Sequence, residues 1–247
     1  AREESLLCRT YGRYPVSIAS GKGSRVTDLD GKEYVDLLAG IAVTSLGHCN
    51  EEIAQVIEKQ ARKLIHVSNL FYQEEQLELA EELLSLSHFG KAFFCNSGAE
   101  ANEALIKLAR KNGSEKGRCE IIVMNDSFHG RTLATLAATG RSKYRKGFSP
   151  DMPGFKFVNY NDIEAVRNAI DGKTAAVMLE PVQGEGGIIP ADREYLKAVR
   201  ELCDKNDIML LFDEVQCGMG RTGSFFAWQS FGVEPDALSM AKALGNG

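Results

Sequence analysis

Short apolar runs alternate with amphipathic stretches through the second half of the chain. The runs contain four or five residues, the length of strands that are buried on both faces. They are Ala92–Cys95, Ile121–Met124, Ala175–Leu179 and Ile208–Phe212. The stretches between them have helical spacing of apolar residues, and they are Ala99–Lys111, Arg131–Thr139, Asp162–Ile170 and Asp192–Lys205. This alternation predicts βαβ units, so we expect an α/β fold with a mainly parallel central sheet and helices on both faces.

The first part of the chain has a different pattern. Two alternating runs, Arg25–Leu29 and Glu33–Leu38, flank the pair Asp30-Gly31, and this arrangement predicts a β-hairpin. A helix is expected after Asn50, whose side chain can cap its first turn. A second helix is expected over Glu74–Ser87.

Composition and charge argue against several classes of protein. The net charge of −5, without a dense basic stripe, argues against nucleic-acid binding. No apolar run approaches the roughly 20 residues that span a bilayer. The six cysteines form no CxxC pair, which favours a reducing cytoplasm, and the four histidines lack metal-ligand spacing. We therefore expect a cytoplasmic protein with no metal, nucleic acid or membrane among its partners.

Polar segments follow each of the four predicted strands. They are Asn96–Glu100, Asn125–Arg131, Glu180–Gly187 and Asp213–Gln216. Ligands of parallel α/β sheets bind beyond the carboxyl ends of the strands. We therefore expect these segments to meet at one edge of the sheet and to form a binding site there.

The segment Asn96–Glu100 opens a predicted helix. Gly98 would let a ligand approach the backbone, and the free N–H groups of the helix end favour a phosphate. An ordinary capping box between Ser97 and Glu100 explains the same residues equally well. The segment is not a Walker loop, and no GxGxxG follows a strand, so a dinucleotide site is not expected.

Two further segments have both functional and structural interpretations. Phe128 could stack on a flat ring and Arg131 could hold a carboxylate, or they could be a core aromatic and a surface cation. The acids of the Gly-rich segment Glu180–Gly187 also suit a surface turn.

A buried carboxylate and a lysine complete the pattern. Asp213 directly follows a buried strand, where a carboxylate is costly unless it has a partner. Lys242 lies among small and apolar residues, which suits a desolvated amine nucleophile, although a snorkelling surface lysine fits as well. Taken together, a phosphate cradle, an aromatic ring, an acid and a lysine are what pyridoxal phosphate requires. Its aldehyde needs an amine, and its ring nitrogen needs a carboxylate to remain protonated.

At this point the motifs resemble those of the class III pyridoxal phosphate aminotransferases, which have the fold type I architecture. Within that class, the resemblance is greatest to the branch that acts on acetylornithine in arginine biosynthesis. The motifs cover nearly the whole chain in the family's order. They are Asp30-Gly31, Gly40–Val43, Leu46–His48, Ser68–Leu70, Asn96–Glu100, Phe128–Thr132, Glu180–Gly187, Leu211–Gln216, Gly220–Gly223 and Ala241–Ala243.

The resemblance implies a cofactor-binding role for five residues around the ring. Lys242 would hold the cofactor covalently and shuttle a proton between it and the substrate. Asp213 would pair with the pyridine nitrogen, and Gln216 would bond the phenolic oxygen. Val215 and Phe128 would enclose the ring between them.

The resemblance also implies roles for the remaining residues of the site. Gly98 and Ala99 would bind the phosphate, with Ser97 beside them. Arg131 would hold a substrate carboxylate. Glu185 would pair with an arginine of the C-terminal region, which would help one pocket to accept both an amine and a dicarboxylic acid.

The chain begins with Ala1 rather than Met and ends at Gly247, directly after the lysine loop. The resemblance implies that a small C-terminal domain is absent. It implies that a threonine after the lysine loop is absent too, which in the family reaches the phosphate of the neighbouring subunit's cofactor. We therefore divide the chain into an N-terminal segment of a small domain, residues 1–50, and a truncated cofactor-binding domain, residues 51–247. Turnover by these residues alone is not expected, and a leader removed before Ala1 is left open.

The implied reaction is transamination by a homodimer with its sites at the subunit interface. The expected substrates are N2-acetyl-L-ornithine and 2-oxoglutarate, and the alternative amine donors are ornithine, succinylornithine and 4-aminobutyrate. A relative that keeps the scaffold but binds no cofactor is a different class of interpretation. The presence of Lys242, Asp213 and the phosphate loop argues against it.

Overall fold

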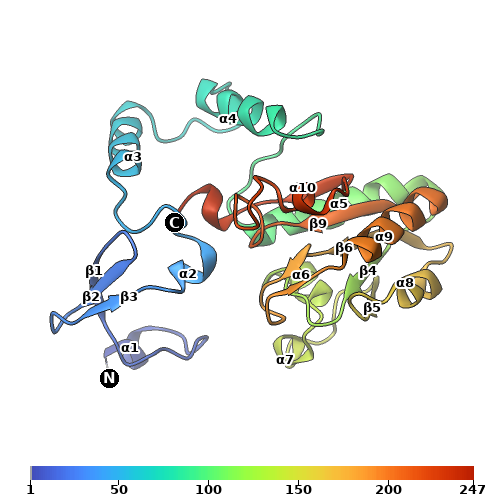
Figure 1. Cartoon of the computed structure of the whole chain (residues 1–247), viewed down its shortest axis with the longest axis horizontal. Coiled ribbons are helices and arrows are strands. Elements are labelled where there is room, and N and C mark those ends of the chain that lie inside the picture. Colours follow the sequence, from blue (N-terminus) through green and yellow to red (C-terminus); the bar gives the residue numbers. More distant parts are fainter. Residues whose placement is uncertain (1) are drawn as a thin grey trace. The chain divides into compact units, whose positions relative to one another are not determined.

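The computed structural model describes residues 2–247, which form two compact units (Figure 1). The first unit contains residues 2–67 and Asn246, and the second contains Ser68–Gly245 and Gly247. The sequence-based division at residue 50 stays a prediction about the complete protein. Among the described residues, no helix combines the length and the apolar character needed to cross a bilayer.

The first unit contains a three-stranded antiparallel sheet in the order β1-β2-β3. The predicted hairpin is confirmed, because a turn at Asp30-Gly31 joins β2 to β3, and the Asp28 carboxylate accepts the N–H groups of Asp30 and Lys32. Asn50 caps the third helix by accepting the N–H groups of Glu52 and Ile53. The elements are α1 (Arg2–Leu6), β1 (Ile18–Lys22), β2 (Arg25–Asp28), β3 (Glu33–Val35), α2 (Ala39–Ala42) and α3 (Glu51–Lys63).

The second unit is built on a five-stranded sheet in the order β10-β9-β6-β4-β5, in which every pairing is parallel. Its strands are β4 (Glu120–Met124), β5 (Phe155–Val158), β6 (Thr174–Leu179), β9 (Met209–Asp213) and β10 (Ala237–Ser239). A two-stranded antiparallel ribbon, β7 (Val182–Gln183) with β8 (Ile189–Pro190), lies in the segment after β6. The predicted α/β fold with a mainly parallel sheet is confirmed.

Helices cover both faces of this sheet. Successive strand residues point to opposite faces, so neighbouring residues of one strand pack against different helices. Ile122 and Val177 pack into one apolar cluster with residues of α9, whereas Ile121 and Ala176 pack into a second cluster with residues of α5. The helices of the unit are α4 (Glu74–Ser85), α5 (Gly98–Gly113), α6 (Leu133–Ala138), α7 (Ser142–Arg145), α8 (Ile163–Ala169), α9 (Arg193–Asn206) and α10 (Ala227–Phe231). Two short 3-10 turns, η1 (Ser114–Lys116) and η2 (Lys242–Leu244), complete it.

One predicted strand is absent from the described structure. The run Ala92–Cys95 makes no strand pairing, and Phe93 is 76% exposed. Conversely, β5 and β10 at the two edges of the sheet were not predicted. A strand requires a neighbouring strand for its hydrogen bonds, and an apolar run does not reveal whether that neighbour is present.

Candidate active site

Asp213 lies at the carboxyl end of β9 and is 3% exposed. One carboxylate oxygen, Oδ2, is 2.7 Å from Nδ1 of His129 and accepts a hydrogen bond of 2.7 Å from the amide of Asn102. The other oxygen accepts the N–H group of Val215 at 3.0 Å and lies 3.4 Å from the Ser239 hydroxyl. Within the protein, the Asp213 carboxylate is therefore surrounded by His129, amide and hydroxyl groups, and no arginine pairs with it among residues 2–247.

His129 is 2% exposed, and it reaches Asp213 from the segment after β4. Burial lowers the pKa of His129, but the hydrogen bond and the charge of Asp213 outweigh it, so that the pKa lies above its ordinary value. The other ring nitrogen, Nε2, is buried and has no hydrogen-bond partner within residues 2–247. His129 therefore orients the Asp213 carboxylate from the protein side.

Glu180, the residue after β6, is a second buried carboxyl group at this edge. It is 5% exposed, and it accepts the N–H group of Phe128 at 3.0 Å. Burial raises the pKa of Glu180 to about 8, and the negative charge of Asp213 acts in the same direction. Glu180 therefore joins the segments after β4 and β6.

The predicted phosphate segment forms the N-terminus of α5, a helix of 16 residues. One half of the predicted capping box is present, because Ser97 accepts the N–H group of Glu100 at 3.2 Å. The Glu100 carboxylate accepts the N–H group of Asn96 at 2.6 Å, one residue before the cap, instead of that of Ser97. A Cβ at Gly98 would lie 2.8 Å from Cγ1 of Val215. The glycine therefore makes room for Val215 and keeps the helix end close to the residues that follow Asp213.

Two other close approaches bring the same segments together. A Cβ at Gly98 would lie 3.2 Å from that of Ala241, the residue before Lys242. A Cβ at Gly130 would lie 3.0 Å from Cβ of Ala99, and Gly130 has a φ of +143°. The lysine loop and the segment after β4 therefore both approach the N-terminus of α5.

Lys242 follows β10, in which Ser239 pairs with Asp213 across the parallel ladder. Its amine is partly buried, and burial lowers the pKa of Lys242 while the charges of Asp213, Glu185 and Glu180 oppose that shift. A lowered pKa leaves more of the amine unprotonated and thus able to act as a nucleophile. The structure therefore brings the predicted lysine to the same edge of the sheet as the predicted acid.

Gln216 lies against the Gly-rich segment that follows β6. A Cβ at Gly184 would collide with the Gln216 side chain, since it would lie 2.5 Å from its Cδ. Gln183 fastens this segment to the residues after β4, because its amide donates to the carbonyl oxygen of Asn125 at 2.9 Å. These contacts hold Gln216 and the Glu185 loop side by side.

Aromatic and cationic residues form the remaining part of the site. The Arg131 guanidinium lies 4.5 Å from the centre of the Tyr144 ring and 5.6 Å from that of Phe128. Arg141 donates to the carbonyl oxygen of Glu185 at 2.7 Å and lies 3.9 Å from its carboxylate. The sequence analysis did not identify Tyr144 or Arg141.

The residues at this edge fit pyridoxal phosphate. Asp213 is held as an oriented acceptor for a protonated ring nitrogen, and Lys242 supplies an amine with a lowered pKa. The N-terminus of α5 offers N–H groups for a phosphate. The assignment of each predicted residue to an atom of the cofactor stays a prediction.

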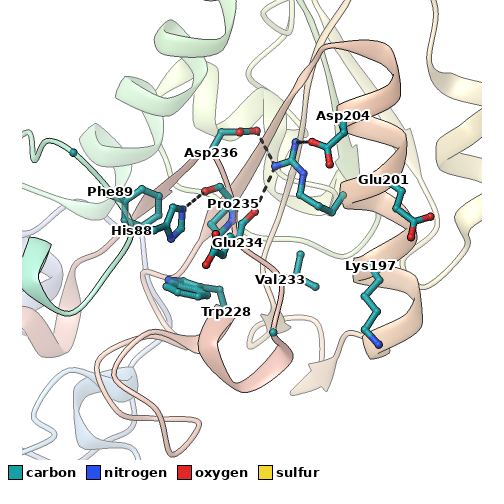
Figure 2. Close-up of a pocket in the computed structure, with 13 residues that line it drawn as sticks. His88, Phe89, Lys197, Glu201, Asp204, Trp228, Val233, Glu234, Pro235 and Asp236 are labelled. Carbon is teal, nitrogen blue, oxygen red and sulfur yellow. Dashed lines mark hydrogen bonds and ion pairs between the residues drawn. The ribbon is translucent and has the colours of Figure 1, made fainter.

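A separate hollow of about 790 Å³ lies beside α9 and contains none of the predicted site residues (Figure 2). Its most buried cation, Arg200, lies 2.9 Å from the Asp236 carboxylate and 2.7 Å from that of Asp204. His88 on the opposite wall lies 2.9 Å from the carbonyl oxygen of Pro235. The guanidinium of Arg200 is therefore paired with carboxylates of the protein itself.

Comparison with known proteins identifies the family. Residues 7–247 match the family model described as aminotransferase class-III. The chain belongs to the class III aminotransferases. This confirms the resemblance seen in the sequence, and membership of this pyridoxal phosphate-dependent class confirms the predicted cofactor.

Curated relatives of this class III aminotransferase match almost the whole chain. A protein of Methanocaldococcus jannaschii named acetylornithine aminotransferase is 58% identical over 99% of this chain and 62% of its own length. A protein of Clostridium acetobutylicum with the same name is 52% identical over 99% of this chain and 64% of its own length. The chain thus spans less than two thirds of these relatives.

Solved structures of related enzymes have the same fold. The N-acetylornithine aminotransferase of Stenotrophomonas maltophilia K279a is 45% identical, with a TM-score of 0.83 over 96% of this chain and 60% of that one. The ornithine aminotransferase of Toxoplasma gondii ME49 is 33% identical, with a TM-score of 0.93 over 98% of this chain and 58% of that one. The fold type I architecture is therefore confirmed.

Proposed function

We propose that the complete protein transfers an amino group from N2-acetyl-L-ornithine to 2-oxoglutarate. The products are N-acetyl-L-glutamate 5-semialdehyde and L-glutamate, and the reaction is a step of arginine biosynthesis. The observation that carries this proposal is the set of relatives named acetylornithine aminotransferase, which are 50–58% identical over nearly the whole chain. The buried Asp213 and the partly buried Lys242 at one sheet edge support it.

In this proposal pyridoxal phosphate supplies an electron sink for the bond changes at the substrate carbon. Asp213 would accept a hydrogen bond from the protonated ring nitrogen, and His129 keeps the carboxylate oriented. Lys242 would hold the cofactor through Nζ and would carry a proton to and from the substrate carbon. Gln216 would donate a hydrogen bond to the phenolic oxygen, and Val215 would lie against one face of the ring.

The other predicted residues take positioning and binding roles. Phe128 would lie against the second face of the ring, and the segment Ser97, Gly98 and Ala99 would bind the phosphate. Arg131 holds a substrate carboxylate in a bidentate fork. Glu185 lies close to Arg141. Its pairing with an arginine helps one pocket to accept first an amine donor and then a dicarboxylic acceptor.

We also propose that the complete protein is a cytoplasmic homodimer whose N-terminal segment, residues 1–50, belongs to a small domain. All six cysteines are free in the structure, which agrees with a reducing compartment. Light scattering of the full-length protein should give twice the subunit mass. A monomer that transaminates at full rate would contradict the homodimer.

Ornithine is the second candidate for the amine donor. The similarity to the Toxoplasma gondii ornithine aminotransferase, with its TM-score of 0.93, favours it, although that identity is lower than in the acetylornithine relatives. Removing the acetyl group would expose a second charged amine, which a site built for the amide would disfavour. Measuring turnover with each donor distinguishes acetylornithine transamination from ornithine transamination.

The test is a comparison of kcat/KM for four amine donors with full-length protein and 2-oxoglutarate. The donors are N2-acetylornithine, ornithine, succinylornithine and 4-aminobutyrate. We expect kcat/KM for acetylornithine to exceed that for ornithine by at least about tenfold, equivalent to about 1.4 kcal/mol of transition-state binding. Equal values, or a preference for ornithine, would overturn the assignment.

A further inference from the structure

Tyr144, on the short helix α7, is surrounded by cations. The Arg131 guanidinium carbon lies 4.5 Å from the centre of its ring, Nζ of Lys143 at 4.9 Å and the Arg141 guanidinium carbon at 5.5 Å. The Phe128 and Tyr144 rings pack in a T-shaped arrangement, at a centroid distance of 5.7 Å. Cations are attracted to the negative face of an aromatic ring, so Tyr144 provides a common platform for these groups.

Arg131 uses this platform without using its hydrogen-bond donors. Within residues 2–247, the Arg131 side chain makes no hydrogen bond and no ion pair. Its guanidinium makes cation–π contacts with the rings of Tyr144 and Phe128. A guanidinium has five N–H donors in a rigid fork. A ring that holds its face leaves that fork available, whereas a protein carboxylate would occupy it.

Arg141 contacts the same ring and is engaged in a different way. Its guanidinium donates to the carbonyl oxygen of Glu185 at 2.7 Å and lies 3.9 Å from the Glu185 carboxylate. The cation beside Glu185 is thus Arg141 and not Arg131. Tyr144 therefore lies between an arginine that is engaged by the Glu185 loop and one that is not.

We propose that Tyr144 is a positioning residue of the substrate-carboxylate site. Its ring holds the Arg131 guanidinium in an orientation in which the fork can accept a substrate carboxylate. This inference deepens the proposed function and depends on it, because it takes Arg131 as the carboxylate-binding residue. The physical gain is preorganisation, since less side-chain freedom is lost when the carboxylate arrives.

The ring and the hydroxyl of Tyr144 can be tested separately in the full-length, cofactor-loaded protein. Tyr144→Leu removes the aromatic face, and we expect KM for acetylornithine and for 2-oxoglutarate to rise roughly fivefold with little change in kcat. Tyr144→Phe keeps the face and should restore both values. A simple alkylamine that has no carboxylate should react with the Tyr144→Leu protein as fast as with the wild type.

A binding measurement provides a readout that does not depend on turnover. Calorimetry with glutarate, a dicarboxylate that does not react, should show roughly fivefold weaker binding to Tyr144→Leu and wild-type binding to Tyr144→Phe. In a protein that already carries Arg131→Gln, Tyr144→Leu should weaken glutarate binding no further, because the two residues act as one unit. A thermal melt identifies any variant that has lost its fold.

The outcomes separate the two proposals. If Arg131→Gln leaves glutarate binding intact, the carboxylate role of Arg131 is wrong and the role of Tyr144 fails with it. If Arg131→Gln weakens binding and Tyr144→Leu does not, only the positioning role of Tyr144 is overturned. Equal losses for the alkylamine and the carboxylate substrates, or for the Phe and Leu variants, would also overturn it.

Discussion

Two arginines in the second unit show how differently the same side chain is used. Arg200, in the hollow beside α9, is close to two carboxylates and also reaches the carbonyl oxygen of Glu234 (Figure 2). Arg131, beside the strand ends, lies on aromatic rings and has no ion pair among the described residues. The first arrangement pairs both terminal nitrogens of the guanidinium with carboxylates, whereas the second leaves the donors of Arg131 available. Compensated charge thus marks a structural network, and oriented but uncompensated charge marks a candidate binding site.

The carboxylates of the two regions differ in the same way. Asp236 accepts the N–H group of Leu210 at 2.6 Å and is paired with Arg200. Asp213 is held by His129, Asn102 and backbone, and no lysine or arginine of residues 2–247 forms an ion pair with it. An oriented carboxylate without a permanent cation is suited to meet the cation of a cofactor ring.

The largest expected effect is that of removing the amine at the strand ends. Lys242→Ala should abolish the covalent linkage to pyridoxal phosphate and lower kcat by about 10³-fold or more, since it removes both the amine and the proton carrier. Borohydride reduction followed by mass spectrometry detects the linkage. Lys205→Ala, at an exposed position on α9, is the matched control and should behave as wild type. Retained covalent cofactor in Lys242→Ala would refute the role of this lysine.

The next largest effect should come from the carboxylate behind the ring. Asp213→Ala should keep some bound cofactor and lower kcat by about 10²-fold or more, because the ring nitrogen loses the acceptor that keeps it protonated. Absorbance spectra report the bound cofactor, and steady-state assays report the rate. Asp236→Ala, which removes the carboxylate beside Arg200, should instead affect stability with little change in kcat. Near-normal activity of Asp213→Ala would contradict the assignment.

Glu180 should make the stability of the cofactor-free protein depend on pH. Its pKa is raised from 4.5 to about 8, so between these values the folded protein holds a proton that the unfolded chain has released. The free energy of unfolding should therefore fall as pH rises through this window, by up to about 1.4 kcal/mol per pH unit. Glu180→Gln should remove this contribution. Urea unfolding between pH 5 and pH 8 measures it, and identical slopes for both proteins would show that Glu180 is ionised when folded.

The smallest effect should come from the compensated arginine. Arg200→Met removes the partner of Asp236 and Asp204, and we expect the free energy of unfolding to fall by about 1–2 kcal/mol. The values of KM should not change, because the network is separate from the strand-end site. Lys197→Met on the same helix, where the lysine makes an exposed pair with Glu194, is the control. A higher KM in Arg200→Met would show that the two regions are coupled.

Much of the fold could be predicted from local pattern. The runs that became β4, β6 and β9 are apolar throughout because both faces of a covered parallel sheet are buried. The polar segments that follow them could be assigned to one edge from topology alone. The edge strand β10 contains only three residues and gave no clear signal, and the run Ala92–Cys95 gave a strand signal without a described partner.

The residues that support the site were harder to predict. Asn102 lies within α5, where one polar residue on a helix gives no sign that it points at a carboxylate. Ser239 reaches the same carboxylate from β10, and its hydroxyl bonds Asn102 at 2.6 Å. His129 had a usable signal, since it stands between Phe128 and Arg131 in the polar segment that follows a strand. Its contact with Asp213 joins positions 84 residues apart.

The sequence by itself determined the α/β class, the edge of the sheet at which polar residues gather, and the family. These follow from periodicity and short motifs, which are local properties of a chain. Only the tertiary structure decided which groups surround Asp213, that Glu180 is buried so that its pKa is raised, and that Arg131 lies unpaired on Tyr144 while Arg200 is paired with acids. The reason is that charge, burial and hydrogen bonding depend on neighbours in space, and folding brings together residues that are far apart in the chain.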